Sequence, residues 1–104
     1  MGPEGEVYVA YAFQLTDPVP DDANIYLVRS LDKGKTWSRP KRLNQDQTSR
    51  VQFFPAITVG PDGVVHAMWG DMRDDPVENS YHIYYASSDD GGRTWSVNSR
   101  VTDF

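Results

Sequence analysis

The chain has 104 residues, a formal net charge of -5, a pI near 4.7 and no cysteine. An acidic chain lacks the basic surface that binding to nucleic acid or to an anionic membrane requires, and the missing cysteines exclude disulfides and thiolate metal sites. No apolar run is long enough to span a membrane, and the first residues lack the basic and apolar regions of a signal peptide. We therefore expect one domain with no nucleic-acid or membrane partner, in a compartment that the sequence leaves open.

Short apolar and aromatic runs between turn signals predict an all-β chain that begins with a strand at residues 7–13. This run is apolar at successive positions, which is typical of an inner strand buried on both faces. The polar loop 14–23 contains Asp17-Pro18, where a strand ladder cannot continue. A strand at 24–29, a tight turn at 30–37 and a strand from Thr36 to about Leu43 follow.

The second half of the chain repeats this order and places one additional strand in front of it. Residues 54–59 predict the additional strand, which ends at the turn 60–63. A strand at 64–69, a polar loop at 70–80, a strand at 81–87, a turn at 88–95 and a last strand from Thr94 to about Thr102 complete the predicted order.

The two turns share the pattern S-x-D-x-G-x-T-W, formed by Ser30, Asp32, Gly34, Thr36 and Trp37 and again by Ser88, Asp90, Gly92, Thr94 and Trp95. In such a turn the Asp accepts hydrogen bonds from the turn's own amides, the Gly takes a positive φ, and the Thr and Trp begin the outgoing strand. The shift that moves Ser30 onto Ser88 aligns essentially the whole chain with itself without a gap, and we call it the repeat shift. A period this long is more typical of propeller blades than of helical solenoids.

This pattern resembles the Asp-box, or bacterial neuraminidase repeat, of the sialidase-like β-propellers. The resemblance implies four-stranded antiparallel blades, with strands A to D from the inside outwards. It places each box as a structural turn between strands C and D, away from the ligand face, with its tryptophan packed between blades. The strand order then reads B-C-D-A-B-C-D, a single domain over 1–104 with a partial blade at about 1–46 and a full blade at about 47–104.

About two blades leave two outer blade faces and one strand edge, residues 7–13, without a neighbour. A heterologous contact between copies closes into a ring or grows into a filament. The sequence therefore predicts a homo-oligomer through blade faces or strand edges, with two to four copies and three as the first expectation.

The resemblance also places the loops 14–23, 44–52 and 70–80 together on the ligand face. The densest polar group in these loops comprises Asp71, Arg73, Asp74, Asp75 and Glu78. Four carboxylates around one arginine suit a sugar or a calcium ion, and Trp69 stands beside them where a sugar ring would stack. The alternative is a solvated acidic loop with a local salt bridge.

Sialidase chemistry is not expected, although residues 53–57 resemble the segment that carries the first arginine of the family's substrate-carboxylate triad. Phe53 occupies that arginine position, and recognition of the carboxylate rests on bidentate arginine contacts. His66 and His82 have no third metal ligand near them in the sequence, and no nucleophile elbow or phosphate loop is present. We therefore assign no catalytic residue, metal or cofactor.

The sequence thus predicts a non-catalytic Asp-box propeller module for binding or self-assembly, with carbohydrate as the candidate ligand. Two alternatives stay open. The chain is part of a sialidase-like glycoside hydrolase, or it is a gene fragment without an independent function. Related repeats are often secreted, but the cellular location is not assigned.

Overall fold

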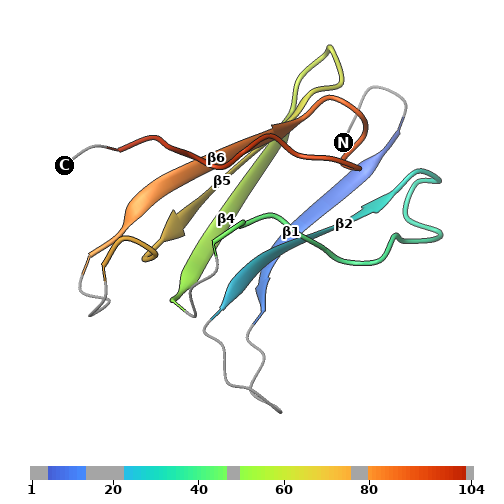
Figure 1. Cartoon of the computed structure of the whole chain (residues 1–104). Coiled ribbons are helices and arrows are strands. Elements are labelled where there is room, and N and C mark those ends of the chain that lie inside the picture. Colours follow the sequence, from blue (N-terminus) through green and yellow to red (C-terminus); the bar gives the residue numbers. More distant parts are fainter. Residues whose placement is uncertain (1–4, 14–22, 47–49, 76–79, 103–104) are drawn as a thin grey trace.

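The computed structural model describes residues 5–13, 23–46, 50–75 and 80–102, and it contains two antiparallel sheets (Figure 1). The first sheet has the order β1 (Val7–Phe13), β2 (Asn24–Ser30) and β3 (Lys41–Arg42). The second sheet has the order β4 (Gln52–Val59), β5 (Val65–Asp71), β6 (His82–Ser88) and β7 (Ser99–Arg100). The predicted all-β fold with three strands followed by four is confirmed.

The two sheets repeat not only their order but also their register. β1 pairs with β2 from Val7 opposite Ser30 to Phe13 opposite Asn24. The repeat shift converts this pairing into that of β5 with β6, which runs from Val65 opposite Ser88 to Asp71 opposite His82. Equivalent positions of the two sheets can therefore be compared residue by residue.

The outermost strands are shorter than predicted, since β3 and β7 have two residues each. After each turn the chain contacts the neighbouring strand through a serine. Ser38 donates its amide to the carbonyl of Arg29 (2.8 Å), and its hydroxyl accepts from the Arg29 amide (3.0 Å). Ser96 makes the same pair of contacts with Ser87. Because a hydroxyl takes the place of a backbone carbonyl, the regular ladder begins only further along.

The prediction that the strands at 7–13 and 64–69 are buried on both faces is wrong. Val9 and Phe13 of β1 are 42% and 51% exposed, and burial alternates along β5, where Met68 is 44% exposed between two buried residues. Successive side chains of a strand point to opposite faces. Each sheet is thus covered on one face only.

The covered faces pack against each other and form the core between the sheets. The first sheet and the segment after it contribute Ile25, Leu27 and Leu43, and the second contributes Ala67, Trp69, Tyr84 and Ala86. β1 also lies beside β4, although the two strands belong to different sheets (Figure 1). Among the described residues, no helix is long and apolar enough to cross a membrane.

The connections gather at two opposite ends of the sheets. Figure 1 shows the turn 60–63 and the second S-x-D-x-G-x-T-W turn at one end, and the segments next to residues 14–22 and 76–79 at the other. This separation agrees with the predicted arrangement of turns and loops. Glu78 and most of the loop 14–23 lie outside the described residues.

Candidate functional site

The first Asp-box closes on itself through its serine and aspartate. The Ser30 hydroxyl donates to Asp32 Oδ1 (2.7 Å) and accepts from the Gly34 amide (2.7 Å). The Asp32 carboxylate accepts from the Thr36 amide (2.8 Å) and from the Thr36 hydroxyl (2.5 Å). The serine hydroxyl and the aspartate carboxylate are thus hydrogen-bonded within the turn itself.

The second Asp-box makes the same contacts. The Ser88 hydroxyl donates to Asp90 Oδ1 (2.8 Å) and accepts from the Gly92 amide (2.9 Å). Asp90 Oδ1 accepts from the Thr94 amide (2.9 Å), and Asp90 Oδ2 accepts from the Thr94 hydroxyl. The two copies of the pattern therefore form the same turn.

Two consecutive residues with positive φ bend each box. The glycines of the pattern have φ values of 91° (Gly34) and 84° (Gly92), as predicted. The preceding residue is left-handed as well, and it is Lys33 (63°) in one box and Gly91 (75°) in the other. The sequence pattern missed this second position, because lysine there carries no conformational signal.

Hydrogen bonding shifts the pKa of both box aspartates downwards. The Thr36 hydroxyl and amide and the Ser30 hydroxyl lower the pKa of Asp32 to about 2. The Thr94 hydroxyl and amide and the Ser88 hydroxyl lower the pKa of Asp90 further. Donors aimed at a carboxylate favour its charged form, so the boxes hold their aspartates ionised.

At the opposite end of the sheets, Asp71 is fully buried rather than open to a ligand. Its carboxylate accepts from Trp69 Nε1 (2.8 Å), from Gln52 Nε2 (3.0 Å) and from the Arg73 amide (2.8 Å). Arg73 Nε (3.0 Å) and Nη2 (2.7 Å) also donate to it. The arginine that the sequence placed among four carboxylates is therefore committed to one of them.

Trp69 does not present a ring face to a sugar, and this part of the predicted site is wrong. Its side chain is 1% exposed and belongs to the core between the sheets. The cause is strand alternation, because Trp69 lies on the same face of β5 as the buried Val65 and Ala67. Its indole N–H bonds the buried Asp71 carboxylate and supports the core.

Arg73 connects this buried acid to the neighbouring strands. Its guanidinium lies 4.0 Å above the Tyr84 ring, and Nη2 donates to Asn98 Oδ1 (3.0 Å). Burial by itself lowers the pKa of Arg73, but the hydrogen bonds and charge of Asp71 outweigh it and raise the pKa. The pair is a partly buried structural ion pair.

Asp74 and Asp75 have separate partners. Asp74 Oδ2 accepts from the Tyr84 hydroxyl (2.6 Å) and lies 3.6 Å from Arg100 Nη1. Burial and this contact with Asp74 raise the pKa of Tyr84 to about 12. Asp75 Oδ2 accepts from the amide (2.9 Å) and hydroxyl (2.8 Å) of Ser80. The carboxylates of Asp71, Asp74 and Asp75 thus bind different partners, and the described residues contain no group of three or more His, Cys, Asp or Glu that could hold a metal ion.

Sequence reasoning missed a chain of buried amides that leads to Asp71. Asn44 Oδ1 accepts from the Ile25 amide (2.8 Å), and Asn44 Nδ2 lies within hydrogen-bond distance of Asn24 (2.9 Å), Asp46 (2.7 Å) and Gln52 (3.0 Å). Gln52 continues to Asp71. These members are far apart in sequence, so no local pattern indicated them. We call the set Asn24, Asn44, Gln52, Asp71 and Arg73 the polar seam.

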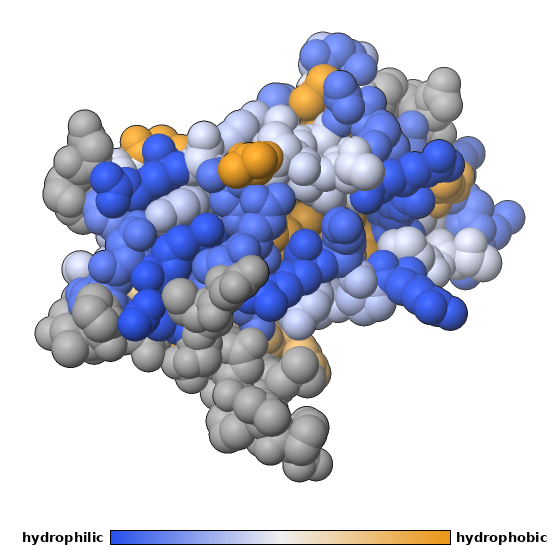
Figure 2. Space-filling model, in the orientation of Figure 1, coloured by the Kyte–Doolittle hydropathy of each residue, from blue (hydrophilic) through white to orange (hydrophobic). Residues whose placement is uncertain are grey.

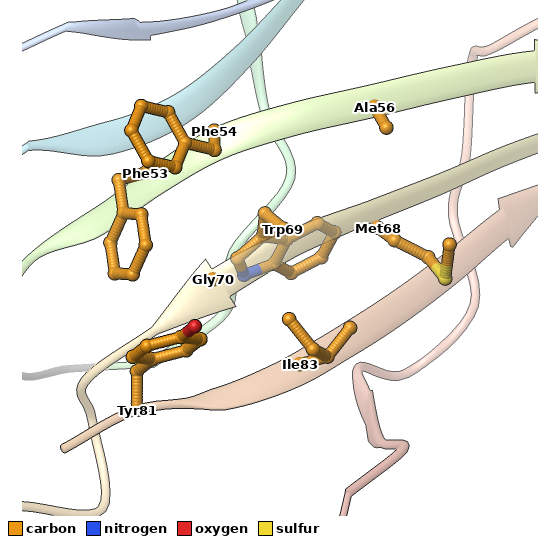
Figure 3. A pocket seen from close by; sticks show the side chains of 8 residues that line it. All are labelled: Phe53, Phe54, Ala56, Met68, Trp69, Gly70, Tyr81 and Ile83. Atoms are coloured by element: carbon orange, nitrogen blue, oxygen red, sulfur yellow. The ribbon is translucent and has the colours of Figure 1, made fainter.

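The face of the second sheet that points away from the first carries an open apolar depression of about 290 Å³ (Figure 3). The Phe53 ring covers Gly70, where a Cβ atom would lie 2.6 Å from the ring. Phe53 also makes edge contacts with Phe54 (5.2 Å) and Tyr81 (5.1 Å). Phe54 sits at a strand bulge with a positive φ of 51° and is 84% exposed. We call this surface the second outer face, and it also includes Ala56, His66, Met68, Ile83 and Tyr85.

The opposite side of the chain has an apolar surface as well, on the face of the first sheet that points away from the second. Tyr11 stacks on Tyr26 with ring centres 6.0 Å apart, and Phe13 makes an edge contact with Tyr26 (6.4 Å). Together with Pro40 these rings line a depression of about 250 Å³. This first outer face also includes Val9 and Val28, which are paired neighbours in the sheet. By contrast, the side turned to the viewer in Figure 2 is mostly hydrophilic, with hydrophobic residues in small separate patches.

A comparison with known families assigns residues 3–102 to one of them, described as BNR repeat-containing family member. The chain belongs to the BNR repeat-containing family. Nineteen chains of solved structures are similar to it, among them the Hadza microbial sialidase Hz136. That match has a TM-score of 0.74 and 22% identity and covers 96% of this chain but 24% of the sialidase. No curated protein matches.

The BNR repeats and the structural match confirm the sialidase-like propeller fold, and this chain spans about a quarter of the length of that sialidase. In the BNR chain, Phe53 lies at the position where the family resemblance expects a triad arginine. It lines the apolar depression of the second outer face, and none of the described residues that line this depression is charged. The surface at Phe53 thus suits apolar packing rather than a carboxylate.

Proposed function

We propose that this chain is a non-catalytic BNR propeller module that functions in assembly, with each outer face packing against a further blade. The observation that carries the proposal is the repeat itself. The repeat shift converts each buried face of the chain into one of its exposed outer faces. Each outer face is therefore equivalent, residue by residue, to a surface that already packs against a blade within the chain.

The buried face of the first sheet has its equivalent in the second outer face. Ile25 corresponds to Ile83 and Leu27 to Tyr85. Leu43, which is 1% exposed in the core, corresponds to Val101, which is 57% exposed. An apolar residue at an exposed position whose equivalent is in the core is accounted for by a missing neighbour.

The buried face of the second sheet has its equivalent in the first outer face. Trp69 and Tyr84 correspond to Tyr11 and Tyr26, and Ala67 and Ala86 correspond to Val9 and Val28. Aromatic positions are aromatic in both sheets, and small apolar positions are apolar in both. The first outer face thus has the apolar and aromatic pattern of a surface that packs between blades.

Hydrogen bonds at the sheet ends follow the same correspondence. Asn24 contacts Asn44, which accepts from the Ile25 amide. In the second sheet His82 Nδ1 lies 2.8 Å from the Thr102 hydroxyl oxygen, which accepts from the Ile83 amide (3.0 Å). The end of β6 therefore has the same hydrogen bonds as the end of β2. In the first sheet the second sheet covers these bonds, and we propose that a further blade covers them in the second.

Catalysis is not part of the proposal, because Phe53 replaces the arginine and the Arg73 side chain is bound to Asp71. We expect no turnover of a fluorogenic sialoside by the purified chain. Turnover that Arg73→Ala abolishes would contradict this and favour the glycoside-hydrolase alternative. The same contacts also leave carbohydrate binding at the polar seam without specific support.

The assembly function is tested by measuring mass against concentration, with light scattering and sedimentation. We expect association that increases with concentration and that persists in Val97→Lys, because Val97 is 81% exposed and lines none of the depressions of the two outer faces. A folded chain that stays monomeric at every concentration would overturn the proposal, and aggregation that does not reverse on dilution would favour the gene-fragment alternative.

A further inference from the structure

Resting on the proposed function, we infer that the partner of each outer face is the opposite outer face of a second copy, so that copies join head to tail. The two outer faces are not alike. The second carries Met68, Ile83 and Tyr85 beside an apolar depression, and the first carries the stacked pair Tyr11 and Tyr26. If the two different faces are complementary in shape, copies join head to tail rather than through like faces.

The chain already contains this contact once. Within it, the face with Ile25 and Leu27 packs against the face with Trp69 and Tyr84. Moving the two partners by the repeat shift in opposite directions brings Ile83 and Tyr85 of one copy against Tyr11 and Tyr26 of the next. Contact of an outer face with the same face of another copy has no such precedent in the structure.

Both outer faces also carry few charged groups, which permits close packing between them. Among the described residues that line their depressions, His66 is the one titratable group besides tyrosine, and its Nδ1 lies 2.5 Å from the Tyr85 hydroxyl. Arg42, which lies opposite Tyr26 in the first sheet, is paired with Asp46 (3.5 Å). Figure 3 shows Phe53 and Tyr81 toward one end of the depression and Met68 and Ile83 toward the other. Apolar surfaces without unpaired charge dock with little desolvation cost.

One contact of the internal interface is not reproduced between copies. Inside the chain, Arg29 Nη1 donates to the carbonyl of Gly91 in the second box (2.6 Å). The equivalent of Gly91 is Lys33, and the equivalent of Arg29 is Ser87, whose side chain is too short for this bond. Head-to-tail packing therefore makes a specific prediction, that an arginine at position 87 supplies the missing bond to the Lys33 carbonyl of the next copy.

A contact between two different faces leaves a free face on each end of the assembly. Such heterologous contacts either close into a ring or continue as a filament. If like faces paired, each outer face would instead join only two copies, through a symmetric contact. This difference allows the two geometries to be separated by mixing variants.

The experiment uses Val9→Lys, which places a charge on the first outer face, and Met68→Lys, which places one on the second. Each variant alone is expected to be monomeric by sedimentation, because one partner face is blocked. An equimolar mixture is expected to form a 1:1 dimer, because each variant keeps the face that the other lacks. Circular dichroism checks that both remain folded, and Val97→Lys is the matched surface control.

Association of Val9→Lys with itself, through its intact second face, would overturn the head-to-tail geometry while leaving the assembly function standing. So would a parent that associates while the mixture stays monomeric. A parent that never associates would overturn the assembly function itself. If a lysine variant fails to fold, Ser87→Arg decides: tighter association, by about tenfold or more in Kd, supports the inference, and unchanged or weaker association contradicts it.

Discussion

The two Asp-box hairpins share the hydrogen bonds of their serine and aspartate but differ in their surroundings. Around the first box, Trp37 is 45% exposed, and a Cβ atom on Gly34 would meet only the Trp37 side chain within 4 Å. Around the second box, a Cβ atom on Gly92 would lie 3.4 Å from Tyr8 and 3.6 Å from Leu27 of the first sheet. The difference shows that the same turn also serves as a docking element.

The tryptophans of the boxes show the same contrast. Trp95 donates its indole N–H to the Gly92 carbonyl (3.0 Å) and packs against the core between the sheets. The expectation that both tryptophans pack between blades is thus met by Trp95 within the chain, and it stays a prediction for Trp37, which is exposed in the single chain. The reason is the position of the boxes, because only the second has another blade of the described chain beside it.

The largest effect is expected for Gly92→Val, compared with Gly34→Val. Both changes place a β-branched residue at positive φ, which costs about 1–3 kcal/mol. At Gly92 the added atoms also meet Tyr8 and Leu27, and overpacking of this kind costs roughly 1–3 kcal/mol more. Urea unfolding at one protein concentration measures both. Equal losses of unfolding free energy would show that the second box is not docked on the first sheet.

A smaller loss is expected for Arg29→Met, which keeps an unbranched apolar stem but removes the donor to the Gly91 carbonyl. A hydrogen bond from a charged group contributes about 1.5–3 kcal/mol. Ser87→Ala, at the equivalent position of the second sheet, is the control and is expected to change stability little. Arg29→Met as stable as the parent would mean that the box docks through apolar contacts alone.

The smallest effects are expected for Asp32→Ala and Asp90→Ala, because water can replace part of what these exposed carboxylates accept. Both boxes make the same bonds, so both variants should lower Tm by a few degrees at neutral pH. Each folded-state pKa lies below the ordinary value of 3.8. The stabilisation is therefore complete above that value and is lost as the pH falls through the folded-state pKa.

Melting curves between pH 7 and pH 2 test this sign. The Tm difference between the parent and Asp32→Ala should be largest above about pH 4 and should shrink as the pH falls toward 2, where Asp32 takes up its proton. The difference for Asp90→Ala should shrink in the same direction, because hydrogen bonds from Thr94 and Ser88 also lower the pKa of Asp90. A Tm difference that grows with acidity would contradict the hydrogen-bonding role.

The sequence was sufficient for those features that are local or periodic. The boxes were predicted with their hydrogen-bonding residues because a tight turn is determined by a few neighbouring side chains. The repeat shift predicted the strand order, and it also holds for the register of β1 with β2 and of β5 with β6. Because the equivalent turns are equally spaced in the two halves of the chain, the two strand pairs have the same register.

The candidate ligand site is harder to predict, because its first residues lie at the end of a strand. The sequence predicts that this strand ends at Trp69, whereas β5 continues to Asp71. Extending the strand by two residues places Asp71 on the same face as Trp69 and Ala67, so alternation would have indicated a buried acid. The polar seam was beyond reach in any case, since Asn24, Asn44 and Gln52 meet only in three dimensions.

The common register has a consequence for how the length of this chain can change. Because the pairing of β1 with β2 reappears unchanged in β5 with β6, inserting or deleting one whole period adds or removes a unit without creating a new type of surface. An insertion of another length inside a strand shifts its register and can turn its buried side chains to the other face. We therefore expect a chain with residues 47–104 duplicated in tandem to fold with the parent's circular dichroism per residue, whereas a duplication of half that segment should not. The length of such a protein therefore changes in whole repeat units.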